Sequence, residues 1–241
     1  MNIIKTDLGV AIERPNAEPL PIRHIIGIGR NYAEHAAERG AEVPEHPMYF
    51  TKNPASVTVH GAPIVIPACC NSEATGGEQV DYEAELAVVI GRQAKDVTES
   101  EALSCVLGYC CANDVSARWW QKHGSGGQFN RGKSFDTFCP LGPVLTPAAE
   151  VSDPQKLEIV FRLNGEEMQR DTTANMVYPV AFLISELSRG TTLLPGTTIL
   201  TGTPSGVGAA RTPPRFLRPG DVAEVEVGGL GVLSNPVEDV G

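Results

Sequence analysis

Short apolar segments, rich in β-forming residues and bounded by Gly, Pro or Asn, recur along almost the whole chain. Segments of this kind are typical of β-strands, because turn-forming residues end each one before a helix can develop. Asn164-Gly165 suits a tight hairpin, and Gly228-Gly229 divides the last segment into two strands. The predicted strands cover residues 24–29, 47–51, 62–67, 82–91, 107–113, 156–163, 197–200 and 222–233. The pattern predicts a mainly β fold.

Helical signals are fewer. Thr98 and Glu101 form a capping-box pair ahead of an apolar stretch that reaches Leu107, which predicts a helix there. A second predicted helix opens at residues 178–179 and ends near residue 190, and a third, short helix is expected at residues 32–39. With 241 residues, the chain can bury one core, as a single domain or a domain with a small appendage. We therefore expect an α+β fold dominated by strands.

Composition excludes several partners. The formal net charge is −10, and no run of Lys and Arg forms a basic stripe, so nucleic acid is not an expected partner. No segment has the length and apolar character needed to cross a bilayer, so we expect no membrane partner and a cytoplasmic location. The six cysteines lack the spacing of zinc or redox motifs and are interpreted as reduced and mostly buried.

Two glutamates stand directly before a continuous apolar run. In a strand, Glu83 and Glu85 would share one face about 7 Å apart. The run that follows, residues 86–90, is typical of a strand buried on both sides, where paired carboxylates repel each other unless a cation or protons compensate. Asp114, at the end of the next apolar strand, can supply a third oxygen. Three carboxylates without nearby His or Cys suit Mg²⁺ or Mn²⁺, with Ca²⁺ as a further candidate, better than zinc.

The alternative is that Glu-x-Glu lies on the wet face of a half-exposed strand. Glu224 and Glu226 are interpreted in this way, because they alternate with Val225 and Val227 and no apolar run follows them. The spacing of Glu83 and Glu85 alone does not decide between a metal site and a solvated face.

The order of several motifs resembles that of the fumarylacetoacetate hydrolase family. The resemblance spans the chain from about His24 to Asn235. The motifs are Gly29-Arg30-Asn31-Tyr32 with His35 and Glu38, Asp81-Tyr82-Glu83-x-Glu85, Asn113-Asp114-Val115-Ser116-Ala117-Arg118 with Gln121, Gly132-Lys133-Ser134-Phe135-Asp136, and Thr201-Gly202-Thr203-Pro204-x-Gly206-Val207-Gly208.

This resemblance implies a mixed β-roll or β-sandwich of the type found in the C-terminal domain of that family. It is closest to the shorter, acylpyruvase-like members and implies a homodimer. Residues 1–20 would then be an N-terminal extension packed on the core, and residues 21–241 would form the catalytic domain. The resemblance also implies a divalent ion, Mg²⁺ or a similar one, held by Glu83, Glu85 and Asp114.

Roles for further residues are implied in the same way. His35 and Glu38 would form a catalytic pair on a lid over the substrate. The predicted contacts with substrate oxygens are Arg118, Gln121 and Lys133 on the catalytic side, and Arg30, Tyr32, Gly202 and Thr203 on the substrate-binding side. Where members of the family commonly carry Asp or Asn after the arginine, this chain has Trp119-Trp120, so the partner of Arg118 is left open.

The implied activity is hydrolysis of a carbon–carbon bond in a 1,3-diketo acid such as fumarylpyruvate or acetylpyruvate, a reaction of aromatic catabolism. Two other enzymes fit the same small keto-acid site: a decarboxylase of oxaloacetate-like β-keto acids, and an isomerase or tautomerase of hydroxy-dienedioates. A catalytically silent ligand-binding dimer is the alternative outside enzymes. The presence of both His35 and Glu38 favours hydrolysis, because such a pair can activate water.

Overall fold

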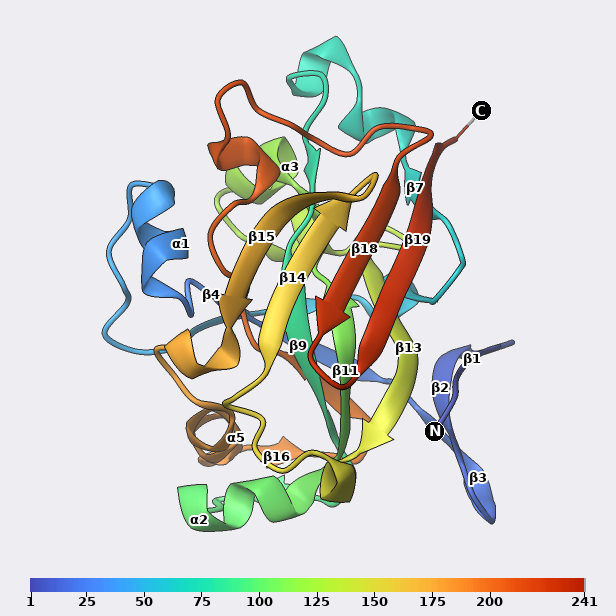
Figure 1. Cartoon of the computed structure of the whole chain (residues 1–241), viewed down its shortest axis with the longest axis vertical. Helices are drawn as coiled ribbons and strands as arrows, with labels where there is room; N and C mark the ends of the chain where they lie inside the picture. The colour runs from blue at the N-terminus through green and yellow to red at the C-terminus, as the bar shows by residue number, and fades with distance from the viewer. Residues whose placement is uncertain (241) are drawn as a thin grey trace.

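A computed structural model of the chain describes residues 1–240 and is mostly β. Two sheets pack face to face and hold most of the strands (Figure 1). The larger sheet has seven strands in the order β5-β4-β17-β9-β11-β13-β6. Its members are β4 (His24–Gly29), β5 (Met48–Lys52), β6 (Val57–Val59), β9 (Ala84–Ile90), β11 (Val106–Asn113), β13 (Cys139–Pro147) and β17 (Thr197–Leu200).

The second sheet has five strands in the order β15-β14-β18-β19-β7 and covers the middle of the first. Its members are β7 (Ile64–Ile66), β14 (Glu158–Leu163), β15 (Glu166–Thr172), β18 (Val222–Val227) and β19 (Gly231–Asp239). Most neighbouring strands in the two sheets are antiparallel, while β17 with β4, β13 with β6, and β19 with β7 are parallel. The sheets are therefore mixed, as expected for the predicted roll.

Smaller elements complete the chain. A three-stranded sheet is formed by β1 (Ile3–Thr6), β2 (Gly9–Arg14) and β3 (Ala17–Pro21). Two further sheets have two strands each: β8 (Val80–Asp81) pairs with β12 (Ser116–Ala117), and β10 (Ala94–Lys95) pairs with β16 (Thr192–Leu193). The helices are α1 (Ala33–Glu38), α2 (Glu99–Ala102), α3 (Arg118–Lys122), α4 (Asn130–Lys133) and α5 (Val180–Ser188), with short 3₁₀ turns between them. Within residues 1–240, no helix combines the length and the apolar character that a bilayer crossing requires.

Strand β9 lies at the centre of the core and is buried on both faces, as its apolar run predicted. Leu86 and Val88 point into the cluster between the two sheets, where they join Phe161 of β14. The alternate residues Ala87 and Val89 point the other way, into a second cluster. A side-chain period of two explains this division.

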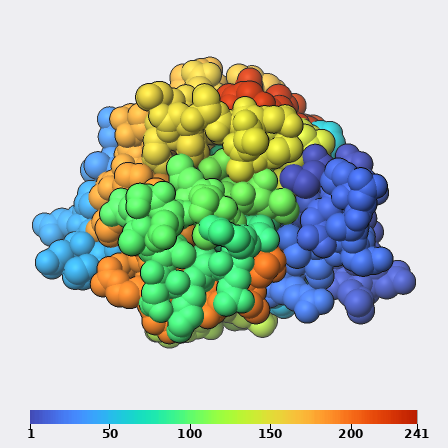
Figure 2. Space-filling model, turned by 90° about the horizontal axis from the view of Figure 1, so that it is seen from below, coloured from blue at the N-terminus to red at the C-terminus, as the bar shows by residue number. Residues whose placement is uncertain are grey.

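The N-terminal strands cover the far face of the larger sheet. Ile3 and Ile12 belong to the second apolar cluster, together with Val89 of β9. The amino group of Met1 donates to the carbonyl of Leu145 over 2.8 Å, which ties the start of the chain to β13. Figure 2 shows these strands gathered at one side of the molecule.

Both predicted hairpin turns are confirmed. Asn164 and Gly165 join β14 to β15 with φ of 54° and 80°, the left-handed values that a two-residue turn between twisted strands requires. Residues 228–230 join β18 to β19, where Gly229 has φ of 79°. Glu224 and Glu226 are half-buried and alternate with buried Val225 and Val227, which confirms the solvated face expected for them.

Other boundaries differ from the prediction. The strand predicted for residues 82–91 begins at Ala84, because residues 82–83 form a break between β8 and β9. The Thr98–Glu101 capping box is present, but the helix ends after one turn of 3₁₀ structure and Leu107 lies in β11. β13 was not predicted, since prolines normally exclude a strand. Its ladder with β11 is irregular between Tyr109 and Cys111, where Pro143 lies, whereas Pro147 pairs with β11 and Pro140 with β6 in regular register.

Candidate active site and metal centre

The pairing of β9 with β11 brings the three acidic residues together. Ala112 lies opposite Glu85 and Asn113 opposite Ala84, so Asp114 follows in register opposite Glu83. The Asp114 amide donates to the Glu83 carbonyl over 2.9 Å, and the Glu83 amide donates to Asn113 Oδ1 over 3.0 Å. One ligand oxygen of each acidic residue lies within 4.8 Å of the others, and all three residues are buried. The predicted convergence is confirmed.

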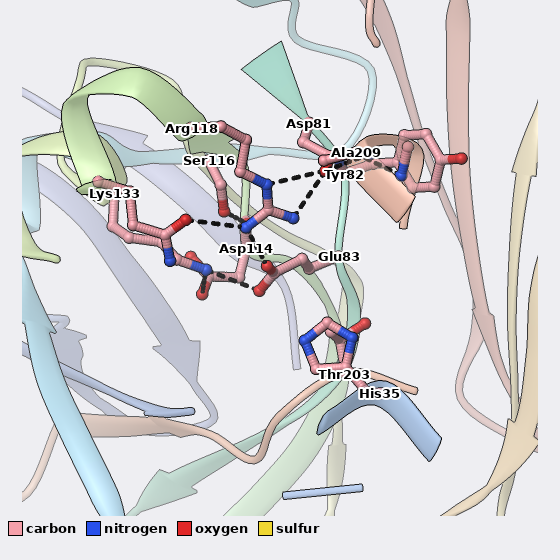
Figure 3. Close-up of polar contacts among 12 residues, drawn as sticks. His35, Asp81, Tyr82, Glu83, Asp114, Ser116, Arg118, Lys133, Thr203 and Ala209 are labelled. Carbon is pink, nitrogen blue, oxygen red and sulfur yellow. Dashed lines mark hydrogen bonds and ion pairs between the residues drawn. The ribbon is translucent and has the colours of Figure 1, made fainter. Parts of the chain in front are cut away.

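Three cations contact the triad, and Figure 3 shows two of them, Lys133 and Arg118. The ammonium group of Lys133 donates to Glu83 Oε2 over 2.6 Å and to Asp114 Oδ2 over 2.5 Å. Arg118 Nη1 donates to Glu83 Oε1 over 2.7 Å. Lys52 donates to Asp114 Oδ1. Glu83 and Asp114 are therefore both compensated by cations of the protein itself.

Lys52 is a site residue that the sequence analysis missed. It is the last residue of β5 and is only 2 % exposed. A lysine at the end of an apolar strand usually reaches solvent, so its position in the sequence carries little signal. Its burial against Asp114 makes it a member of the charged cluster.

Glu85 differs from the other two carboxylates. Among residues 1–240 it has no ion-pair partner, and the Gly202 amide donates to its Oε2 over 2.6 Å. Burial, with the nearby negative charges of Asp114 and Glu83, raises the pKa of Glu85 well above its usual range. Burial alone would also raise the pKa of Glu83, but Lys133 and Arg118 hold it well below its usual value.

The site fits a divalent ion. Glu85 is a buried carboxylate without a cation, and a dication between the three acidic residues would offset its charge. The ligand set consists of carboxylate oxygens, which Mg²⁺, Mn²⁺ and Ca²⁺ prefer over soft ligands. Glu83, Glu85 and Asp114 can therefore hold such an ion, and their chemistry alone does not select one of the three.

Asp81 is the partner of Arg118 that the Trp119-Trp120 departure left open. Arg118 Nε donates to Asp81 Oδ2 over 2.8 Å, and its Nη2 lies 2.7 Å from the same oxygen. Arg118 Nη1 also donates to Gln121 Oε1 over 3.1 Å. In Figure 3 the guanidinium lies between Asp81 and Glu83. The arginine is thus fixed by two carboxylates and a side-chain amide, and Trp119, the residue that follows it, takes no part.

Gly132 explains how Lys133 reaches the triad. A Cβ atom at Gly132 would lie 2.5 Å from the backbone nitrogen of Gln121 and 2.7 Å from the backbone carbonyl oxygen of Ala117. Only glycine permits this close approach of α4 to α3. The contact places Lys133 beside Arg118 and Gln121, so three predicted catalytic residues come from two short helices packed together.

The predicted histidine–glutamate pair is formed. His35 Nδ1 lies 2.7 Å from Glu38 Oε1, three residues further along α1. Glu38 Oε2 accepts the Gly206 amide over 2.8 Å, so the carboxylate is fixed on both oxygens. With Nδ1 engaged, Nε2 is the nitrogen of His35 that remains available to a ligand.

One cavity collects most of the predicted site residues. Glu83 of the triad and His35 of the pair both line it, together with several apolar side chains. The side chains that line the cavity are Ile28, Arg30, His35, Arg39, Met48, Phe50, Glu83, Arg118, Gln121, Lys122, Phe129, Lys133 and Thr203.

Two residues predicted to contact substrate lie outside this lining. Tyr32 is 1 % exposed, and its hydroxyl has no hydrogen-bond partner among residues 1–240. Burial, followed by the charges of Glu85 and Asp171, raises its pKa. Gly202 donates its amide to Glu85, so its observed contact is with a triad carboxylate.

Thr203 lines the cavity as predicted and is held from behind. Gln169 Nε2 donates to Thr203 Oγ1 over 2.9 Å and to the Pro204 carbonyl over 2.8 Å, while Gln169 Oε1 accepts the Ala84 amide over 3.0 Å. The hydroxyl proton of Thr203 therefore remains available as a donor. Gln169, from β15, was missed because nothing in its local sequence marks it as different from a surface glutamine.

The glycine-rich loop of residues 201–208 touches three carboxylates with its backbone. The Gly202 amide donates to Glu85, the Gly206 amide to Glu38, and the Gly208 amide to Asp81 over 2.7 Å. The sequence predicted that this loop can approach an anion closely. The anions observed there are side chains of the protein itself.

Asn31 joins three parts of the site. Its Nδ2 donates to the Thr201 carbonyl over 2.8 Å and to the Tyr178 carbonyl over 3.0 Å, and its Oδ1 accepts the Tyr178 amide over 2.8 Å. The neighbouring Arg30 has φ of 56°, a left-handed conformation that is uncommon outside glycine. The Asn31 contacts hold the chain in this conformation at the cavity wall.

Asn31→Ala is expected to lower the free energy of unfolding by about 2–4 kcal/mol, because it leaves buried backbone groups unpaired. Urea unfolding measures this. The control is Asn175→Ala, at an exposed residue whose side chain bonds only to Asp171 and whose loss should cost under about 0.5 kcal/mol. Equal losses in the two variants would contradict the role assigned to Asn31.

The tryptophan pair lies at the edge of the site. The rings of Trp119 and Trp120 meet edge to face with centroids 5.1 Å apart, and Arg131 stacks on Trp120 at 5.2 Å. Both residues are half-buried and neither lines the cavity. The structure thus gives the pair a packing role at the edge of the site.

The fold and the acidic triad define a class of mainly β proteins with a buried carboxylate site that can hold a metal ion. Comparison with known proteins identifies the family. Residues 24–238 match the family model described as fumarylacetoacetate (FAA) hydrolase C-terminal. The chain belongs to this family.

Several curated relatives are similar over most of this chain. It is 45% identical over 221 residues to the oxaloacetate tautomerase YisK of Bacillus subtilis, which covers 91% of this chain and 71% of that protein. It is 46% identical over 213 residues to the mitochondrial oxaloacetate tautomerase fahd2 of Xenopus laevis, which covers 88% of this chain and 65% of that protein. The chain thus spans about two thirds of the length of these relatives.

Solved structures agree with the fold. The 5-carboxymethyl-2-hydroxymuconate delta-isomerase from Mycobacterium smegmatis superposes with a TM-score of 0.80 at 34% identity, covering 100% of this chain and 98% of that one. The fumarylacetoacetate hydrolase from Exiguobacterium antarcticum has a TM-score of 0.80 at 39% identity, covering 95% and 81%. The predicted fold class is confirmed.

Proposed function

We propose that this protein is a metal-dependent isomerase that interconverts the keto and enol forms of a 2-oxo diacid of the oxaloacetate type. The single observation that carries the proposal is His35, which is hydrogen-bonded to Glu38 and lines the same cavity as Glu83 of the triad. The names of two curated relatives, both oxaloacetate tautomerases, and of one solved structure, an isomerase, support it further. This is closer to the isomerase alternative from the sequence than to hydrolysis.

The chemistry requires one carbon-bound proton to move. An ion held by Glu83, Glu85 and Asp114 would offset the negative charge that develops on the 2-oxo oxygen when C3 loses its proton. His35 Nε2 takes that proton, and Glu38 on Nδ1 orients the ring and stabilises its charged form. The C3–H bond breaks, the 2-oxo oxygen takes a proton from a water molecule, and His35 returns its proton to the hydroxide that remains. The reverse sequence regenerates the keto form.

Neighbouring residues would position the substrate. The cations of Arg118 and Lys133 line the cavity and favour the acid end of the ligand, although each is already bound to Glu83. Burial alone would lower the pKa of Lys133, but Asp114 and Glu83 raise it above its usual value. Lys133 therefore acts as a fixed positive charge rather than as a base. Thr203 contributes a hydroxyl proton.

Hydrolysis of an acylpyruvate is the second candidate. The observation that favours it is the same pair, because a histidine oriented by a carboxylate can also take a proton from water. The two functions differ in what must reach His35: a carbon-bound proton in isomerisation, and a water molecule beside the distal carbonyl in hydrolysis.

A substrate panel separates these candidates. With Mg²⁺ or Mn²⁺ present, we expect the protein to accelerate ketonisation of enol-oxaloacetate, followed by ultraviolet absorbance, without release of CO₂. Removal of the ion with a chelator should lower the rate by at least about 10³-fold, since several kcal/mol of stabilisation are lost, and re-addition should restore it.

The panel also includes an acylpyruvate and a hydroxy-dienedioate. Cleavage of the acylpyruvate at a higher kcat/KM than ketonisation would replace the proposal with hydrolysis. Release of CO₂ from oxaloacetate would replace it with decarboxylation. If no compound turns over with either ion, the protein is a ligand-binding member of its family.

A further inference from the structure

Besides Arg30, which the sequence already assigns to substrate binding, the cavity contains two cations that the chemistry above does not use. Arg39 directly follows α1, and Lys122 is the last residue of α3. Both line the cavity. Within residues 1–240, neither side chain forms an ion pair or a hydrogen bond, whereas the deeper cations Arg118 and Lys133 are each fixed by two carboxylates. The unused charges therefore lie where a ligand can meet them.

Exposure orders these cations by depth. Lys133 is 2 % exposed and Arg118 is 7 % exposed, so they form the floor beside Glu83. Arg39 is half-buried and Lys122 is exposed, so these two lie toward the mouth. The cavity therefore has a charged floor and a cationic mouth.

The positive charges of the cavity act on both mouth cations. Burial lowers the pKa of Arg39 and Arg118 lowers it further, while the carboxylates of Asp81, Glu83 and Glu38 act in the opposite direction without reversing the shift. The pKa of Lys122 is lowered by burial and then by Arg39 and Arg118. Like charges gathered in one cavity cost free energy unless an anion joins them. The arrangement thus has the character of an anion site.

Part of the cavity lining is apolar. Ile28, Met48, Phe50 and Phe129 line the same cavity and offer no side-chain hydrogen bond to a ligand. A compound that fits this lining has charge at both ends and little polarity between them. A short 2-oxo diacid has that pattern, and a 2-oxo monoacid lacks the second charge.

We infer that Arg39 and Lys122 bind the distal carboxylate of a 2-oxo diacid whose 2-oxo acid end lies at the triad. The inference rests on the proposed function and extends it, because it assigns the preference for diacids to two named residues. Arg39 is next to Glu38, so a ligand held by Arg39 also contacts the end of the helix that carries His35. The distal carboxylate would then help to set the position of the catalytic pair.

Binding of a matched pair of acids tests the inference without turnover. The ligands are 2-oxoglutarate and 2-oxopentanoate, which have the same carbon chain and differ in the distal carboxylate. In isothermal titration calorimetry with Mg²⁺-loaded protein, the diacid should bind at least about tenfold more tightly than the monoacid, which corresponds to about 1.4 kcal/mol of binding free energy. In Arg39→Gln with Lys122→Gln, this preference should fall to under about twofold.

The control is Arg23→Gln, an exposed arginine that does not line the cavity, and it should keep the wild-type preference. The inference is overturned if wild-type protein binds both acids equally or binds neither. It is also overturned if the double variant loses affinity for both acids to the same degree, or for neither. If the diacid preference depends on Arg39 and Lys122 but enol-oxaloacetate is not ketonised, the proposed function fails and the anion site stands.

Discussion

Glu85→Gln is expected to stabilise the protein when no metal is present, while Asp114→Asn destabilises it. Glu85 is buried without a cation, and burial with its acidic neighbours raises its pKa, so a neutral side chain of the same shape relieves the site. We expect a gain of about 1 kcal/mol in the free energy of unfolding. Asp114 instead compensates Lys52 and Lys133, and its loss should cost about 3–5 kcal/mol.

Both substitutions should abolish function despite their opposite effects on stability. Each removes one carboxylate ligand, so Mg²⁺ should no longer raise the melting temperature, and kcat/KM should fall by at least about 10³-fold. Unfolding is measured in chelator and in Mg²⁺. If both variants lose the same stability in chelator, or if Mg²⁺ stabilises Glu85→Gln as much as wild type, the triad is not a metal site.

His35→Gln is expected to lower the kcat for ketonisation by about 10²–10⁴-fold, the usual contribution of a general acid–base group. Glutamine keeps a polar side chain on α1 but cannot take up the C3 proton. Incorporation of deuterium at C3 of oxaloacetate, followed by NMR in D₂O, should slow by the same factor. The affinity for Mg²⁺, measured by calorimetry, should stay within about twofold of the wild-type value, because the side-chain hydrogen bond of His35 goes to Glu38 and not to a triad oxygen.

A matched control is His46→Gln, an exposed histidine outside the cavity, which should retain full activity. Glu38→Gln should have a smaller effect than His35→Gln, since it removes the orienting charge and leaves the imidazole. Activity of His35→Gln above about half that of wild type would assign proton transfer to another group. Loss of Mg²⁺ binding together with activity would make the histidine a structural residue of the site.

Local patterns predicted the elements that depend on local chemistry. The hairpin at Asn164-Gly165 was predictable because its left-handed turn needs those residue types. The buried strand β9 was predictable because burial on both faces requires an uninterrupted apolar run. The meeting of Glu83, Glu85 and Asp114 was predictable because two successive strands carry them at matching ends.

Features that depend on tertiary contacts escaped the sequence analysis. β13 contains three prolines, a residue that normally excludes a strand, and only Pro143 lies in the irregular part of its ladder with β11. Lys52 and Gln169 become site residues because distant strands place them beside Asp114 and Thr203. The partner of Arg118 was sought beside it in the sequence, whereas Asp81 lies in β8, the strand paired with β12.

The loop of residues 201–208 ties three functions to one stretch of backbone. Its amides hold Glu85 of the acidic triad, Glu38 of the histidine pair and Asp81, the partner of Arg118. A shift of this loop would therefore reach ion binding, proton transfer and substrate placement at the same time. Substitutions at Glu85, Glu38 and Asp81 should consequently be energetically coupled, with combined effects that depart from the sum of the separate ones.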